Sequence, residues 1–146
     1  MEYIVGITLA LFFCAAAAAL GMDRERAFYP AVAIAVASYY LAFAASDGRN
    51  EVFLSEAVIA AVFIVAAVVG FKRNPWFAVA ALGGHGVMDA FHDHLVHNTG
   101  VPQVWPGFCM TFDVTAAVIV TVVMLARARR ERVLRAGFNP RHGVLS

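Results

Sequence analysis

Five long apolar segments constrain the fold of this chain more than any other feature of its sequence. A helix needs roughly 20 apolar residues to cross the hydrocarbon core of a bilayer, and each segment meets that requirement. The segments are Tyr3 to Leu20, Ala27 to Ala45, Val52 to Phe71, Trp76 to Leu95 and Trp105 to Ala126. The sequence therefore predicts an all-α polytopic membrane protein with five transmembrane helices.

The composition supports this prediction. Of the 146 residues, 62% are hydrophobic and 14% are charged, whereas soluble domains average about 45–50% apolar and about 25% charged residues. Short links between the segments favour antiparallel neighbours in an up-and-down bundle. We therefore expect residues 1–126 to form one transmembrane domain in a lipid bilayer, followed by a basic cytoplasmic tail, 127–146. No nucleic-acid-binding motif occurs, so nucleic acid is not an expected partner.

The distribution of basic residues predicts an orientation. With five spans, ten of the eleven Lys and Arg residues fall on one side of the membrane and only Arg49 on the other. The positive-inside rule then places the N-terminus outside and the C-terminus in the cytoplasm. Met1-Glu2-Tyr3 lacks the basic n-region of a signal peptide, so the first segment is expected to be a retained transmembrane helix. The tail is expected to extend the fifth helix and to contact anionic lipid headgroups.

A polar cluster interrupts the fourth segment and marks the candidate site. Four of the five histidines lie between His85 and His97, and ionisable residues inside a membrane are costly and commonly functional. At 1.5 Å per residue, Asp89 lies about 12 Å from the end of its helix, and Asp113 lies about 10 Å into the fifth. Both carboxylates are thus expected at similar depth in the outer half of the membrane, where Glu56 also enters.

Helical spacing predicts which side chains meet. His85, Asp89 and His92 share one face at i, i+4 and i+7, while His94 and His97 are expected at the solvated edge of a loop. Gly83, Gly84 and Gly86 form a small-residue patch that predicts close approach of a neighbouring helix. Cys14 and Cys109 are expected to be free thiols. The predicted pocket is lined by Glu56, His85, Asp89, His92, Asp93, Cys109 and Asp113.

Imidazole and carboxylate together predict a metal site. Both suit zinc or iron, and three protein ligands with an open position are typical of catalytic centres. His85 and His92 lie about 10 Å apart along a helix axis, which is too far for one ion with ligand bonds of roughly 2 Å. The predicted ligands are therefore Asp89, His92 and Asp113, with His85 and Glu56 as catalytic groups that move protons. The corresponding function is a metal-dependent hydrolase or related enzyme acting on an apolar substrate.

Two other functions stay open at this point. A transporter subunit would use the same groups to relay protons or metal ions, although the inner half of the bundle offers few polar residues for a path. A structural protein would use them as a hydrogen-bonded network between helices. Haem ligation by His85 or His92 lacks supporting motifs. The sequence leaves open whether the protein is an enzyme and what its oligomeric state is.

Two motifs carry a family resemblance. The pattern HGxxDxxH at 85–92, combined with WPxFCxxxD at 105–113, resembles a family of small bacterial multi-pass membrane proteins of unknown function. The resemblance implies a bacterial inner-membrane protein and no particular activity. The chain is more distantly similar to intramembrane metal-dependent hydrolases of the alkaline ceramidase type, which combine His and Asp ligands from several helices. It departs from them in having five predicted spans rather than seven and no match to their separate serine and histidine motifs.

Overall fold

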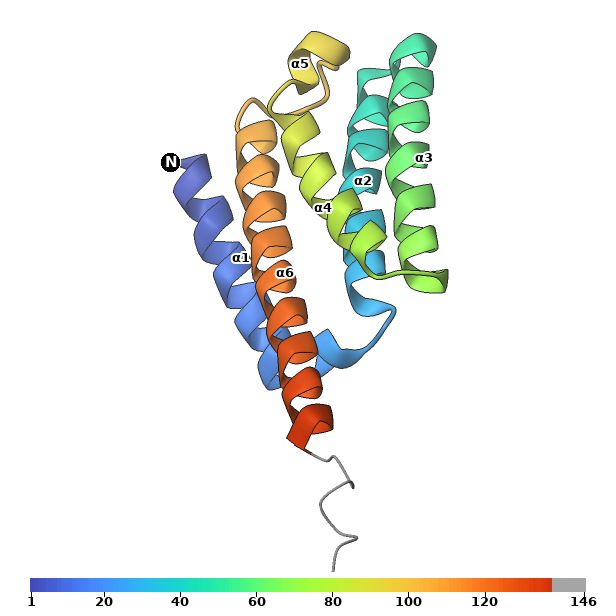
Figure 1. The fold of residues 1–146 in the computed structure, drawn as a ribbon. Helices are drawn as coiled ribbons and strands as arrows, with labels where there is room; N and C mark the ends of the chain where they lie inside the picture. The colour runs from blue at the N-terminus through green and yellow to red at the C-terminus, as the bar shows by residue number, and fades with distance from the viewer. Residues whose placement is uncertain (138–146) are drawn as a thin grey trace, which may run out of the picture.

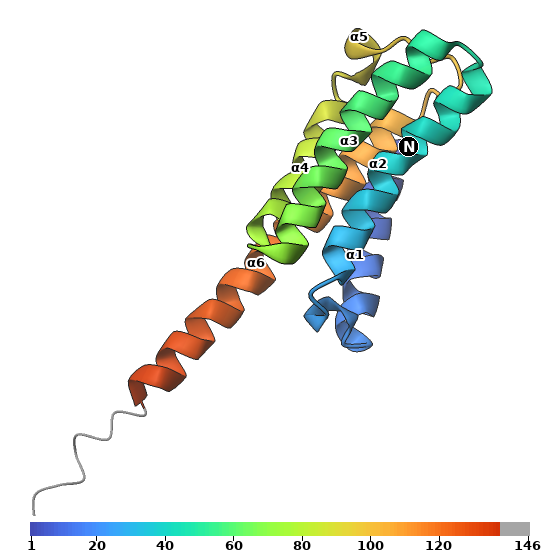
Figure 2. The same cartoon turned by 90° about the vertical axis from the view of Figure 1, so that its right-hand side faces the viewer.

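The computed structural model describes residues 1–137, and these residues form helices and no strands. Figure 1 shows the long helices running alongside one another in alternating directions, and Figure 2 shows α6 extending well past the others. The predicted all-α class is confirmed. The helices are α1 (Glu2–Ala19), the 3-10 helix η1 (Met22–Arg24), α2 (Phe28–Asp47), α3 (Asn50–Lys72), α4 (Trp76–Asp89), α5 (His92–Leu95) and α6 (Trp105–Gly137).

The predicted count of five spanning helices is corrected to four within the described residues. The helices α1, α2, α3 and α6 are long and apolar enough to cross a membrane, which makes this a membrane protein surrounded by lipid. The fourth segment was expected to be helical from Trp76 to Leu95, but α4 ends after 14 residues at Asp89. Its rise is about 21 Å, short of the roughly 30 Å of a hydrocarbon core. The chain nevertheless passes along the bundle a fifth time through α4 (Figure 1).

The helix α4 ends without a helix-breaking residue. Ala90 and Phe91 separate α4 from α5, and the amide of Phe91 bonds to the carbonyl of Met88, three residues back, at 2.9 Å. Neither residue is Gly or Pro, so the sequence carries no stop signal at this point. The first residue after the break, His92, is fully buried against α3.

Small residues let the helices approach closely, as the sequence predicts for the glycine patch. A Cβ atom on Gly86 of α4 would lie 2.9 Å from Asp113 Cβ and 3.0 Å from the Met110 carbonyl, both on α6. A Cβ on Gly83 would lie 3.2 Å from Ala117 Cβ of the same helix. The main core cluster is likewise built mostly of alanine. Close α4–α6 packing is therefore what brings Asp113 to the face of α4 that carries Asp89.

The two ends of the bundle differ in character. The α5 end, where α5 and the loop 96–104 lie, also holds the turn between α2 and α3, which Gly48 makes with a positive φ of 82°. At the opposite end, Arg127 of α6 pairs with Asp23 in η1. From Leu125 to Ala136 the helix α6 is exposed, so the predicted helical extension is confirmed as far as Gly137. Residues 138–146 of the predicted tail lie outside the described residues.

Candidate functional site

His85 is the centre of the candidate site. Its Nδ1 atom donates a hydrogen bond to Asp113 Oδ2 at 2.8 Å, and Asp89 Oδ2 lies 3.4 Å from the same nitrogen. His85 and Asp89 are one turn apart on α4, a spacing at which helical side chains meet, whereas Asp113 comes from α6. One potential ligand atom from each of the three residues lies within 4.8 Å of the others. This grouping is the His/Asp triad.

The carboxylates of the His/Asp triad are incompletely paired. All three side chains are at most 2% exposed, and within residues 1–137 neither oxygen of Asp89 nor Asp113 Oδ1 has a hydrogen-bond partner. Buried polar atoms are almost always hydrogen-bonded, and a buried carboxylate without compensation is expensive. Three acceptor atoms thus converge beside one imidazole in an apolar interior. A divalent cation would satisfy these oxygens and balance two carboxylate charges.

A second polar group lies nearer the α5 end. Glu56 Oε1 on α3 accepts hydrogen bonds from His92 Nε2 at 2.8 Å and from Asn98 Nδ2 at 2.9 Å. Both side chains of the His92–Glu56 pair are fully buried. Asn98 belongs to the loop 96–104, so this one carboxylate ties together α3, the start of α5 and the loop.

Tyr40 of α2 lies between the two polar groups. Its ring stacks on His92 with centroids 4.1 Å apart and lies 5.8 Å from the ring of His85. Its hydroxyl is buried and, among the described residues, has no hydrogen-bond partner. Phe63 of α3 contacts His85 edge to face at 5.1 Å. Aromatic rings therefore enclose both histidines and fix their orientation.

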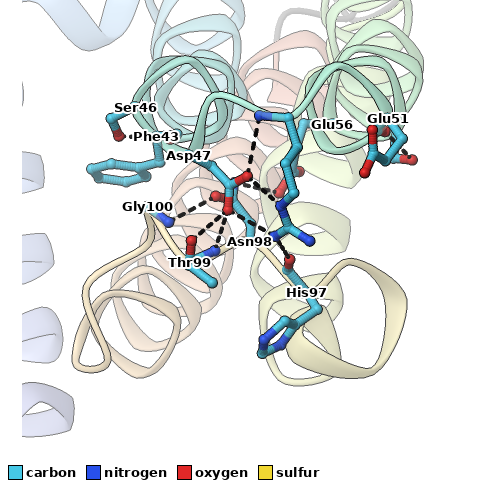
Figure 3. Close-up of polar contacts among 11 residues, drawn as sticks. Phe43, Ser46, Asp47, Glu51, Glu56, His97, Asn98, Thr99 and Gly100 are labelled. Carbon is cyan, nitrogen blue, oxygen red and sulfur yellow. Dashed lines mark hydrogen bonds and ion pairs between the residues drawn. The ribbon is translucent and has the colours of Figure 1, made fainter.

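The loop 96–104 covers the α5 end and is fastened by Asp47 (Figure 3). The backbone amide and the hydroxyl of Thr99 both donate to Asp47 Oδ2, at 2.8 and 2.6 Å. Arg49 donates to both oxygens of Asp47 and, through Nη2, to the carbonyl of His97 at 2.7 Å. The hydrogen bonds to Asp47 raise the pKa of the Arg49 guanidinium, so this guanidinium stays charged across physiological pH. Hydrogen bonds from the α2–α3 turn thus hold the loop 96–104 in place over Glu56 and His92.

The structure groups the predicted site residues differently from the sequence. Asp89 and Asp113 do meet, but the nitrogen between them belongs to His85, while His92 pairs with Glu56. The break at Ala90 and Phe91 is the reason, because it removes His92 from the helical face that it would share with His85 and Asp89. Within the described residues, Glu56 therefore contacts His92 and not the His/Asp triad.

The other residues singled out in the sequence are partly buried near the His/Asp triad and partly exposed. Cys109 is buried one turn before Asp113 on α6, and both cysteines are free thiols, as expected. Asp93, which the sequence placed in the pocket, has an 81% exposed side chain. His94 and His97 are exposed, as expected for loop-edge residues.

Sequence reasoning missed Tyr40 and Asn98 as members of the site. Tyr39 and Tyr40 are adjacent and lie about 100° apart around α2, and nothing local shows which of them faces the histidines. Asn98 lies in an irregular loop, where spacing carries no information about contacts. The one signal that could have found it is compositional, because Asn98 directly follows a histidine-rich segment.

Comparison with models of known protein families, with curated proteins and with solved structures found no match for this chain. The resemblance suggested by the two motifs therefore stays a prediction. The fold and the site define a class only: an all-helical membrane protein with a buried His/Asp group.

Proposed function

We propose that this protein is a membrane-embedded metalloprotein in which His85, Asp89 and Asp113 hold one divalent transition-metal ion, zinc or iron. The observation that carries the proposal is the convergence, among the described residues, of three buried carboxylate oxygens that accept no hydrogen bond beside one imidazole nitrogen. Ligand bonds of roughly 2 Å set the donor atoms of a tetrahedral ion about 3 to 4 Å apart. A small contraction of the His/Asp triad would reach that spacing.

The charge balance also supports a cation. Two ionised carboxylates beside a neutral imidazole would leave two uncompensated charges in an apolar interior, which is strongly unfavourable. A divalent ion cancels them. A metal on Nδ1 requires the proton on that nitrogen to move to Nε2. Protons compete with the metal for the imidazole and for both carboxylates, so we expect uptake to weaken at low pH.

The proposed activity is hydrolysis of an apolar substrate that approaches from the lipid. Three protein ligands leave a position open, at which a metal polarises a substrate carbonyl or activates water. A groove of about 350 Å³ lies between α1, α2 and α6, and its lining includes Phe13, Phe108 and Cys109. Cys109 lies one helical turn before Asp113, and in this scheme the apolar substrate binds in the groove. In this scheme the His92–Glu56 pair accepts and returns protons at the α5 end.

A transporter is the weaker candidate. A path for protons or ions would have to continue from the His/Asp triad toward the opposite end of the bundle. The core in that direction consists of Ala10, Ala33, Ala67, Leu82, Ala116 and similar apolar side chains. We also propose the orientation that the basic residues favour, in a bacterial plasma membrane with the N-terminus and the α5 end outside.

Metal content of the detergent-purified protein, measured by elemental mass spectrometry, tests the metal proposal. We expect close to one zinc or iron per chain in the wild type and less than about a tenth of that in Asp89→Ala and Asp113→Ala, since loss of a ligand lowers affinity steeply. Asp93→Ala is the matched control, because it removes an exposed acid close in sequence, and it should keep its metal. A wild type without metal even after incubation with zinc or iron would overturn the proposal and favour a hydrogen-bonded network.

A further inference from the structure

A second cavity lies at the end of the bundle opposite the His/Asp triad. It has a volume of about 260 Å³ and is bounded by the α1–α2 connection, the start of α4 and the middle of α6. Its deeper wall is apolar and includes Pro30, Val79, Val120 and Val123. Its mouth carries three arginines and two carboxylates, namely Arg24, Arg26, Arg127, Asp23 and Glu25.

Specific contacts hold two of the arginines at the mouth of the cavity. Arg127 donates through Nη1 to the backbone carbonyl of Asp23 at 3.2 Å and through Nη2 to the Asp23 carboxylate. These two bonds fix the guanidinium at the wall, and further N–H groups of its five stay available. Arg26 is held differently, with its guanidinium carbon 6.0 Å from the centroid of the Phe71 ring. Arg24 and Arg26 are both exposed and can orient toward a ligand.

Asp23 supplies an independent observation. This residue is only 9% exposed, and its Oδ1 atom is buried and, within residues 1–137, has no hydrogen-bond partner. Buried acceptors are almost always hydrogen-bonded, and a side chain that lines the cavity can turn such an oxygen toward a ligand donor. The cavity thus offers guanidinium groups for an anion, one acceptor for a hydroxyl, and an apolar wall for a chain.

We propose that this cavity binds the headgroup of one anionic glycerophospholipid that carries hydroxyl groups, of the phosphatidylglycerol type. The phosphodiester lies against Arg24, Arg26 and Arg127, a headgroup hydroxyl donates to Asp23, and an acyl chain follows Val79 and Val123. Three positive groups against two negative ones favour an anionic lipid over a zwitterionic one. Basic cavities between transmembrane helices are known sites for anionic headgroups. The site is separate from the proposed metal centre and does not depend on it.

Native mass spectrometry of the full chain in detergent tests the proposal by titration with phosphatidylglycerol and with phosphatidylcholine of the same acyl chains. We expect one tightly bound phosphatidylglycerol and about tenfold weaker binding of phosphatidylcholine. The double variant Arg24→Gln/Arg26→Gln should lose about tenfold in affinity for phosphatidylglycerol. The control Arg132→Gln/Arg135→Gln removes the same charge from the exposed end of α6 and should change that affinity less than about twofold.

Two further measurements distinguish a lipid site from a site for a free anion. Val123→Trp fills the apolar wall while leaving the arginines in place, and it should also abolish tight binding. Equal binding of the two lipids, equal losses in the two arginine variants, or unchanged binding in Val123→Trp would each overturn the proposal. Displacement of the lipid by an equal concentration of glycerol 3-phosphate would also overturn it, because the site would then recognise a free phosphate.

Discussion

Replacing Gly86 by alanine is expected to separate α4 from α6 and to dismantle the His/Asp triad. The added Cβ would lie 2.9 Å from Asp113 Cβ and 3.0 Å from both the Met110 carbonyl and Val114 Cγ2, and all three atoms belong to α6. Overpacking of this kind typically costs about 1–3 kcal/mol. Because the helices must move apart where Asp113 reaches His85, metal content should fall together with the temperature of unfolding.

Gly84→Ala is the matched control for this prediction. A Cβ on Gly84 would meet Phe63 Cε1 at 3.5 Å, an ordinary contact distance. Both substitutions gain the same helix propensity, about 1 kcal/mol, so the difference between them isolates the contact with α6. Thermal unfolding in detergent and metal content measure the effect. If the two variants unfold at the same temperature and bind equal metal, close α4–α6 packing does not build the site.

Replacing Glu56 by leucine should give the largest loss of stability among substitutions at the α5 end. The carboxylate accepts bonds from His92 and from Asn98, and leucine would leave both donors buried without a partner. An unsatisfied buried group costs about 1–3 kcal/mol, so the free energy of unfolding should fall by roughly 3 kcal/mol. Loss of the bond to Asn98 should also release the loop 96–104, which hydrogen exchange of its amides would report as faster exchange.

Glu56→Gln separates this effect from loss of charge. Glutamine keeps an acceptor oxygen for His92 and Asn98, so most of the stability and the protection of the loop should return. A second control, Glu51→Leu, alters an exposed acid earlier on α3 and should be nearly neutral. A Glu56→Leu variant as stable as wild type, with an unchanged loop, would show that the pair does not hold the cover in place.

The all-helical class and most of the helix bounds could be predicted because they depend on local patterns. Apolar segment length predicted the bounds of α1, α2 and α3 to within a few residues and the start of α6 at Trp105. The continuation of α6 past Ala126 was predicted separately, from the basic tail. The small-residue patch around Gly86 correctly predicted where another helix would approach. The shared face of His85 and Asp89 also follows from helical spacing alone.

The details of the site depend on contacts that no local pattern records. The helix α4 ends after Asp89 without Gly or Pro, in a region where His92 bonds to Glu56 on another helix. That one break shortens the fourth span and leaves His85 beside Asp89 and Asp113, while His92 pairs with Glu56. The stacking of Tyr40 on His92 and the reach of Asn98 to Glu56 join residues 52 and 42 positions apart, so spacing along one helix could not reveal them.

X-ray absorption spectroscopy of the zinc-loaded protein tests the central claim most directly, because it identifies the atoms bound to the metal. Three spectra are needed: wild type, His85→Ala and His92→Ala. We predict oxygen and nitrogen ligands at about 2.0–2.2 Å with the signature of a single imidazole in wild type, lost in His85→Ala and retained in His92→Ala. An imidazole lost in His92→Ala and retained in His85→Ala, or a sulfur ligand at about 2.3 Å from Cys109, would contradict the assignment of His85, Asp89 and Asp113 as the metal ligands.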